Sequence, residues 1–155
     1  MIYVFDTSSL SELDAYYPGI FKSFWAKFDA GASAGDIIST REVRSELNRS
    51  GLVVAMAWAK RNSAVFTTPT AAETLFVAQI LAVPHFKMLI NQKAALNGTP
   101  VADPFVIACA KINAGTVVTE EKPKPNAAKI PNVCAHFGIP CGNLEMFMQN
   151  MGWSF

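Results

Sequence analysis

MIYVFDTSSLSE, residues 1–12, is an apolar run followed at once by residues that start helices. Residues 2–5 are all apolar, do not alternate with polar residues, and so predict a strand buried on both faces of a parallel sheet. Asp6 ends this strand. Ser9 and Glu12 form a capping box, which predicts the start of a helix that Pro18-Gly19 breaks. A strand that leads directly into a helix is the repeating unit of α/β folds.

The same unit recurs along the chain. Residues 36–39 (DIIS) and 116–119 (TVVT) predict two further strands. A second capping box, Ser39 to Glu42, follows the first of these. Helices are expected over residues 20–28, 41–49 and 52–60, and residues 31–35 are expected to form a loop. A further helix should run from a third capping box at 70–73 to Pro84. Another should run from Asp103 to Gly115, which is expected at the C′ position. Residues 130–151 predict one short strand and a terminal helix. Short strands separated by helices predict an α/β fold with a parallel sheet.

Composition limits what the chain can be. It has 155 residues, of which 51% are apolar and 16% charged, with a formal net charge of +1 and a mean hydropathy of +0.24. This excludes intrinsic disorder and fits a single domain over residues 1–155. No global field attracts nucleic acid, so a polyanion must be met by a local patch or a metal. The apolar excess predicts a covered surface, and we expect a homodimer.

The sequence shows neither a disulfide framework nor a targeting or membrane-spanning segment. Three cysteines are too few for a disulfide scaffold, and the first residues lack the basic region of a signal peptide. Two long uncharged stretches, 62–72 and 74–86, are broken by proline and fall short of the ~18–20 residues that span a bilayer. We therefore expect a reduced, cytoplasmic protein without membrane contact.

Acidic residues follow the ends of the predicted strands. They are Asp6 after the first strand, Glu46 in the helix after the second, Asp103 at the start of the central helix, and Glu120 and Glu121 after the third strand. In open parallel sheets the ligand lies beyond the carboxyl ends of the strands. Crowded carboxylates repel and raise one another's pKa, and a divalent cation is the usual remedy. Oxygen ligands favour Mg²⁺ or Mn²⁺.

Two of these acids have an alternative as helix caps. Asp103 before Pro104 is typical of an N-cap, although a capping aspartate keeps a second oxygen for a metal. Asp6 is not needed as a cap if Ser8 and Ser9 fill that role, which makes Asp6 the least dispensable acid.

The glutamates have surface alternatives. Glu42 is explained by its capping box, whereas Glu46 is either a site residue or a helix-surface partner of Arg49. Glu120 and Glu121 either join the site or solvate a loop with the lysines that follow.

In the order VFDTSSL, REVRSEL, ADPFVIACA and VVTEE, the chain resembles a PIN-domain ribonuclease over almost its whole length. Its closing IPNVCAHFGIPC is similar to a PIN subfamily found as toxins of VapBC-like toxin–antitoxin pairs. The resemblance implies a three-layer α/β/α fold with a short, mostly parallel sheet flanked by helices. It also implies one or two Mg²⁺ or Mn²⁺ ions, RNA as the substrate, and a cognate antitoxin protein as partner.

Carried over residue by residue, the family's acids fall on Asp6, Glu46, Asp103 and Glu121, and Ser8 matches the accompanying Ser or Asn. The family usually has aspartate at the fourth position. Glutamate is longer, so Glu120 is an alternative fourth metal ligand.

The predicted function is metal-dependent endonucleolytic hydrolysis of RNA, because a carboxylate-held metal both activates water and neutralises charge on the phosphate. Lys122 and Lys124 are candidate phosphate contacts together with Ser8. A PIN-like RNA- or protein-binding module that has lost activity stays open. An α/β phosphohydrolase of the haloacid-dehalogenase kind is disfavoured, because Ser8 stands where that class needs a second aspartate.

Two further features have structural interpretations. Cys134, His136 and Cys141 match no standard zinc spacing and are expected to be packed in the interior. Trp153 and Phe155 are large apolar groups near the C-terminus, and they dock either on the parent domain or on a second subunit.

Overall fold

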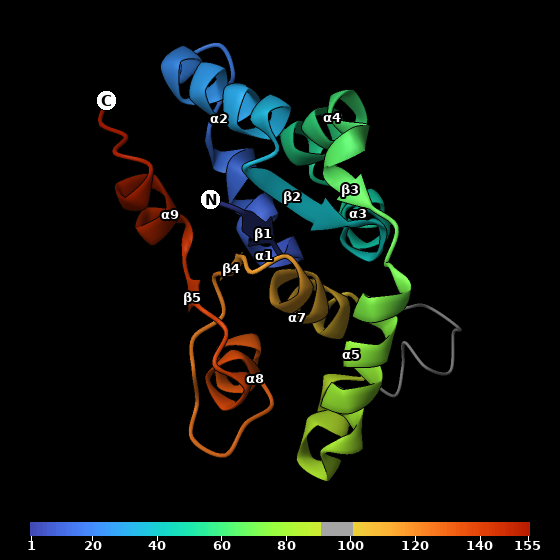
Figure 1. Cartoon of the computed structure of the whole chain (residues 1–155). Coiled ribbons are helices and arrows are strands. Elements are labelled where there is room, and N and C mark those ends of the chain that lie inside the picture. Colours follow the sequence, from blue (N-terminus) through green and yellow to red (C-terminus); the bar gives the residue numbers. More distant parts are fainter. Residues whose placement is uncertain (91–100) are drawn as a thin grey trace.

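Five short parallel strands form the centre of the computed structural model, in the order β3-β2-β1-β4-β5 (Figure 1). The middle strand β1 (Tyr3–Phe5) pairs with β2 (Ile37–Thr40) and with β4 (Thr116–Val118). The short strands β3 (Phe66–Thr67) and β5 (Cys141–Gly142) form the edges. All four pairings are parallel, so the α/β class expected from the sequence is confirmed.

Helices cover both faces of the sheet. The structure describes residues 1–90 and 101–155. The α-helices in these ranges are α1 (Thr7–Ser11), α2 (Lys22–Ala34), α3 (Arg41–Asn48), α4 (Val53–Arg61), α5 (Ala71–Ala82), α7 (Asp103–Ile112), α8 (Ile130–Phe137) and α9 (Leu144–Asn150). The short 3-10 helices are η1 (Glu12–Ala15), η2 (Ser63–Val65) and η3 (Pro84–Leu89). Helices α2, α4 and α9 lie on one side of the sheet, and α5, α7 and α8 lie on the other (Figure 1). This is a three-layer α/β/α arrangement. None of the described helices combines the length and apolar character that a membrane span requires.

The core is built on the alternating faces of β1. Tyr3 and Phe5 point to one face, where the ring of Phe147 in α9 lies with centroids 4.9 and 5.0 Å away. Phe28 of α2 packs against Phe5 at 5.5 Å. Val4 points to the opposite face, where α7 lies. All five side chains are at most 1% exposed, so β1 is buried on both faces, as its unalternating sequence predicts.

The C-terminal segment docks on its own domain. The ring of Trp153 lies 5.2 Å from that of Phe147 and 6.0 Å from that of Phe24. Phe155 stays 69% exposed, with the ammonium of Lys27 5.5 Å from its ring. The choice between docking in cis and in trans is therefore settled for Trp153 in favour of this chain.

Several expected boundaries were wrong. The segment 31–35, expected as a loop, belongs to α2 as far as Ala34, and Gly35 ends the helix with φ 81°. The closing segment contains α8 in addition to the expected strand and helix. At the end of α7 the left-handed residue is Ala114, with φ 51°, and not Gly115. Gly115 is required for a different reason, since a Cβ there would lie 2.9 Å from the carbonyl oxygen of Ile2.

Candidate functional site

Asp6 lies at the carboxyl end of β1 and is the N-cap of α1. Its Oδ1 accepts a hydrogen bond of 2.7 Å from the backbone N–H of Ser9, and its Oδ2 accepts one of 2.5 Å from the hydroxyl of Thr119. The expectation that Ser9 caps the helix was therefore wrong: the first turn starts at Thr7, so Asp6 faces its free N–H groups. Burial raises the pKa of Asp6, against the opposing effect of these hydrogen bonds.

Hydroxyl groups tie the ends of β1 and β4 together. Ser8 Oγ donates to Asp6 at 2.8 Å and accepts from the N–H of Glu120 at 2.9 Å. Thr119 Oγ1, which donates to Asp6, accepts from the N–H of Glu121 at 3.1 Å. Thr119 did not emerge from the sequence as a site residue. Its place as the first residue after an apolar strand and before two acids is the signal that could have found it.

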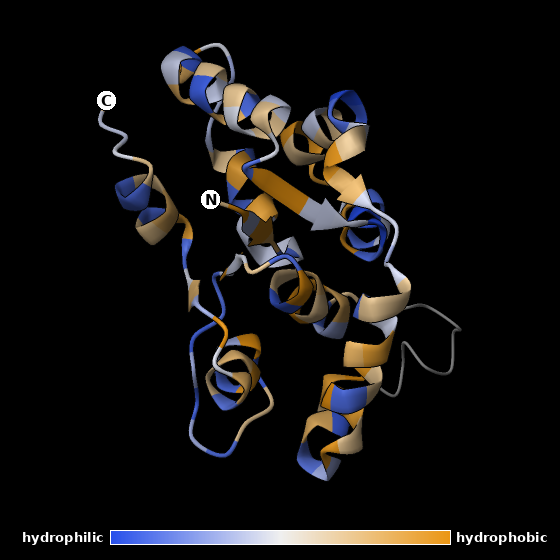
Figure 2. Cartoon of the chain, viewed as in Figure 1, coloured by the Kyte–Doolittle hydropathy of each residue, from blue (hydrophilic) through white to orange (hydrophobic). Residues whose placement is uncertain are grey.

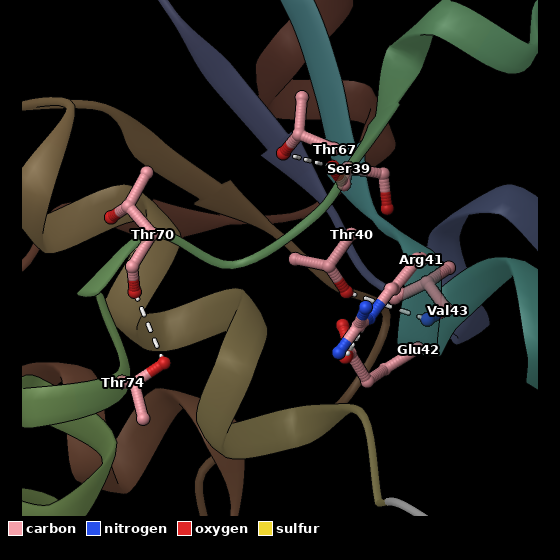
Figure 3. A network of polar contacts seen from close by, with 8 residues as sticks. All are labelled: Ser39, Thr40, Arg41, Glu42, Val43, Thr67, Thr70 and Thr74. Atoms are coloured by element: carbon pink, nitrogen blue, oxygen red, sulfur yellow. Dashed lines mark hydrogen bonds and ion pairs between the residues drawn. The ribbon is translucent and has the colours of Figure 1, made fainter. Parts of the chain in front are cut away.

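The start of α3 is fixed by a polar network at the end of β2 (Figure 3). The expected cap, Ser39, is not available, because its hydroxyl donates to the carbonyl of Phe5 at 2.6 Å. Its carbonyl accepts from Thr67 Oγ1 at 3.2 Å. Thr40 is the N-cap instead and accepts from the N–H of Val43 at 3.4 Å. The N-cap therefore lies one residue later than the capping box predicts, although the helix starts at Arg41 as expected.

That shift changes the role of Glu42. Its side chain is 3% exposed, and Oε1 lies 3.0 Å from Nε of Arg41 (Figure 3). Within the described part of the chain, Oε2 of Glu42 has no hydrogen-bond donor. The capping-box interpretation of Glu42 was thus wrong.

Glu46, one turn after Glu42, joins two helix starts. Its Oε2 accepts from the hydroxyl of Thr7 in α1 at 2.8 Å, and its Oε1 accepts from the N–H of Ala102 at 3.0 Å. Ala102 is the N-cap of α7. The alternative pairing of Glu46 with Arg49 is not found among the ion pairs of the described residues. Glu46 therefore points into the edge where α1 and α7 begin.

Asp103 is not the cap of α7. It is the first residue of the helix, Ala102 is the N-cap, and Pro104 takes the second helical position. Ala102 has no side chain that could cap the helix, and Asp103 makes no capping hydrogen bond there. The expected N-cap role for Asp103 was therefore wrong, because the helix begins one residue earlier than the Asp-Pro pair predicts.

The electrostatic surroundings of Asp103 show which acids gather around it. Burial, followed by the charges of Glu121, Glu46 and Asp6 in that order, raises the pKa of Asp103 to about 7. The ammonium of Lys129 opposes them. The structure therefore gathers three of the sequence-predicted acids around a fourth, the half-buried Asp103.

Glu120 and Glu121 each hold the start of a later helix. Oε2 of Glu121 accepts from the N–H of Ile130, the first residue of α8, at 2.9 Å. Oε1 of Glu120 accepts from the N–H of Leu144, the first residue of α9, at 2.8 Å. Of these two glutamates, only Glu121 is among the charges that raise the pKa of Asp103. The two acids thus point to different helices, and Glu121 is the one that belongs to the group around Asp103.

A pocket of about 350 Å³ opens beside these two glutamates. Its lining includes Glu120, Glu121, Lys122, Cys141 and Met146. The loop between β4 and α8, which carries Lys122 and Lys124, is hydrophilic throughout most of its length (Figure 2). The backbone of Lys124 pairs with the side chain of Asn132 at 3.2 and 2.9 Å, which fixes this loop against α8.

The three cysteines are free thiols. Burial raises the pKa of Cys109 to about 12. Cys134 and Cys141 are hydrogen-bonded to each other, which raises the pKa of Cys134 and lowers that of Cys141. His136 packs edge-on against Phe86, with ring centroids 5.0 Å apart.

The acids around Asp103 are close enough to repel one another, but they do not form a preassembled metal site. Within residues 1–90 and 101–155, no three His, Cys, Asp or Glu side chains are grouped so that they could hold a metal ion. The donor set around Asp103 is composed of carboxylate oxygens, which is the ligand type that Mg²⁺ and Mn²⁺ take. The arrangement thus provides a half-buried acid, Asp103, of raised proton affinity inside a cluster of negative charge.

Comparison with known proteins places the chain in a family. No curated protein sequence matches it. Among solved structures, the chain is similar to the crystal structure of PAE2754 from Pyrobaculum aerophilum. The two share 15% identical residues at a TM-score of 0.45, with 98% of this chain and 97% of that chain covered. A family model described as "Domain of unknown function (DUF4411)" matches residues 3–155, and the chain therefore belongs to the DUF4411 family.

Proposed function

We propose that this protein is a metal-dependent endoribonuclease that hydrolyses phosphodiester bonds of RNA at the carboxyl edge of its sheet. The observation that carries the proposal is the position of Asp103. Its carboxyl group is half-buried, does not cap its helix, and is surrounded by the charges of Glu121, Glu46 and Asp6. Four acids gather at the carboxyl edge of the sheet, and among the described residues none of them forms an ion pair with a base. This favours a cation as their partner. The resemblance to PIN-domain ribonucleases supports the same reaction class.

The chemistry asks two things of the site: an activated water and neutralisation of charge on the phosphate and the leaving oxygen. A bound Mg²⁺ or Mn²⁺ ion supplies both. Asp6 and Asp103 would hold it, with Glu46 and Glu121 completing the ligand set. Ser8 and Thr119 orient the carboxylate of Asp6 through their hydroxyl groups.

The chain's own residues would also bind the RNA. Lys129 is close enough to Asp103 to lower its pKa against the effect of the acids. Lys122 lines the pocket beside Glu121, and Lys124 lies in the same loop. We infer that these ammonium groups contact phosphates on either side of the cleaved bond.

The test is cleavage of a panel of structured RNAs by the purified protein, with and without EDTA. We expect cleavage only with Mg²⁺ or Mn²⁺, leaving 3′-hydroxyl and 5′-phosphate ends. Asp6→Asn and Asp103→Ala should lower the rate by at least ~100-fold, since a lost ligand costs several kcal/mol of transition-state stabilisation. Glu145→Gln is the matched control, because Glu145 is an exposed acid of α9 and is not among the charges that act on Asp103. EDTA-resistant cleavage, 2′,3′-cyclic phosphate ends, or full activity of Asp6→Asn would contradict the proposal.

As biological role we propose the toxin of a toxin–antitoxin pair, with an antitoxin segment that places an arginine or lysine among the acids. We also propose a homodimer. Large apolar side chains remain exposed on this protomer, including Ile20 at 73%, Tyr17 at 60% and Phe21 at 41%. Light scattering at micromolar concentration tests the dimer, and a monomer would contradict it. Purification from the native operon tests the antitoxin, whose absence from the preparation would contradict that role.

A second candidate is an RNA- or protein-binding module without catalysis. The observation that favours it is that Asp6, Glu46, Glu120 and Glu121 are already engaged in hydrogen bonds. Titration calorimetry separates the two candidates. RNA binding without Mn²⁺ binding and without cleavage favours the module, whereas Mn²⁺ binding that Asp6→Asn abolishes favours the nuclease.

A further inference from the structure

Cys134 and Cys141 lie outside the group of carboxylates, and the backbone folds back to bring them together. Helix α8 ends at Gly138, which has φ 67°. The next residue, Ile139, donates its N–H to the carbonyl of Cys134 at 2.9 Å. The chain after α8 therefore folds back toward the last turn of the helix, which contains Cys134. Strand β5 begins with Cys141, two residues after Ile139.

The register of β5 directs Cys141 toward α8. The neighbouring Gly142 faces α9, since a Cβ at Gly142 would run into the side chain of Met146. Successive residues of a strand point to opposite faces. Cys141 therefore points to the face where α8 packs and where Cys134 lies, and each of the two thiols shifts the pKa of the other.

The two sulfurs differ in access. Cys134 is 0% exposed, whereas Cys141 is partly exposed and lines the pocket beside Glu121. A small oxidant in the pocket meets Cys141 first. Reactive cysteines in redox pairs have this asymmetry, with an accessible attacking sulfur and a buried resolving sulfur beside it.

We propose that Cys134 and Cys141 form a reversible disulfide when the protein meets hydrogen peroxide, which links α8 covalently to β5. The thiolate of Cys141 attacks one peroxide oxygen, the O–O bond breaks, and hydroxide leaves and takes up the thiol's proton as water. Cys141 is now a sulfenic acid. The sulfur of Cys134 attacks it, the S–O bond breaks, and the departing hydroxide takes the proton of Cys134. Two thiols and one peroxide give one disulfide and two waters. This inference stands independently of the proposed nuclease function.

Cys109 is an internal control. It is 0% exposed in α7, and its sulfur contacts the side-chain amide of Asn113 at 3.6 Å. No second thiol is hydrogen-bonded to Cys109 among the described residues. Oxidation of the folded protein should therefore spare Cys109 and leave its thiol available to an alkylating reagent after denaturation.

The full-length protein is treated with stoichiometric hydrogen peroxide, alkylated in denaturant, and digested. Residues 130–155 contain no Lys or Arg, so trypsin leaves both cysteines in one peptide, which should be 2 Da lighter and unalkylated. Chymotrypsin cuts after Phe137, between the two cysteines, and should leave two peptides that separate only after reduction. Treatment with dithiothreitol should restore two alkylatable thiols. Three alkylated cysteines after peroxide, or equal oxidation of Cys109, would overturn the proposal.

Single variants assign the order of events. In Cys134→Ser, peroxide should leave a sulfenic acid at Cys141 that dimedone traps, which separates it from oxidised methionine. Cys141→Ser should leave Cys134 reduced, and Cys109→Ser should form the disulfide as the wild type does. A disulfide between two copies of the chain on a non-reducing gel would also refute the inference. The wild-type peptide map is decisive by itself if a variant fails to fold.

Discussion

Replacing Asp103 with asparagine removes one half-buried negative charge and keeps the side-chain volume nearly unchanged. Burial and the charge of Glu121 raise the pKa of Asp103 to about 7, against an ordinary 3.8. The folded protein therefore holds this proton more tightly than the unfolded chain does, and the wild type loses stability as pH rises from about 4 to about 7. At about 1.4 kcal/mol per pKa unit, the loss from this one group reaches about 4 kcal/mol above pH 8. Asparagine does not titrate and does not suffer the loss.

The measurement is the free energy of unfolding in urea, with EDTA present, at pH 5 and at pH 8. Asp103→Asn should be more stable than the wild type by about 1.5 kcal/mol at pH 5 and by about 4 kcal/mol at pH 8. Glu145→Gln, an exposed acid-to-amide change, should stay within about 0.5 kcal/mol of the wild type at both. The same stability gain at both pH values, or a loss at pH 8, would refute the reasoning. Adding Mn²⁺ should narrow the gap if the wild type alone binds it.

Two other changes test single contacts. Glu121→Gln should lower the pKa of Asp103, because Glu121 is the charged neighbour with the largest effect on it. A carboxyl-carbon NMR titration measures this pKa, and an unchanged value would mean that the two groups are farther apart than the structure has them. Gly115→Ala should cost about 1–3 kcal/mol in thermal unfolding, because the new Cβ would lie 2.9 Å from the carbonyl oxygen of Ile2. Gly19→Ala, with nothing within 4 Å of the added Cβ, should leave Tm unchanged, and equal Tm values for the two variants would contradict the prediction.

The strands were predictable because burial on both faces imposes an unalternating apolar run, as in residues 3–5. The helix starts were less so. Asp6 and Ser9 are both good capping residues, and only the position of the first turn decides between them. Ser39 was lost as a cap because its hydroxyl bonds to Phe5 in the neighbouring strand. That contact depends on strand pairing, which local sequence patterns do not contain.

The grouping of acids at one edge followed from the parallel sheet alone, because Asp6 and Glu121 come after neighbouring strands. Their exact engagements did not. Glu121 caps a helix 9 residues later and Glu120 one 24 residues later. The sequence interpretation had not placed a helix at Ile130, so no partner for Glu121 was available to it. Contacts of this kind require the tertiary structure.

The hydrogen bond from Ile130 to Glu121 makes the start of α8 a competitor for the carboxylate group at the sheet edge. A ligand that binds the carboxylate of Glu121 has to break the hydrogen bond between that carboxylate and the amide of Ile130. Binding of a ligand at the sheet edge therefore loosens the first turn of α8. The amide of Ile130 is then a built-in reporter of occupancy. Its hydrogen exchange should quicken when Mn²⁺ binds, while the amide of Leu144, held by Glu120, keeps its rate.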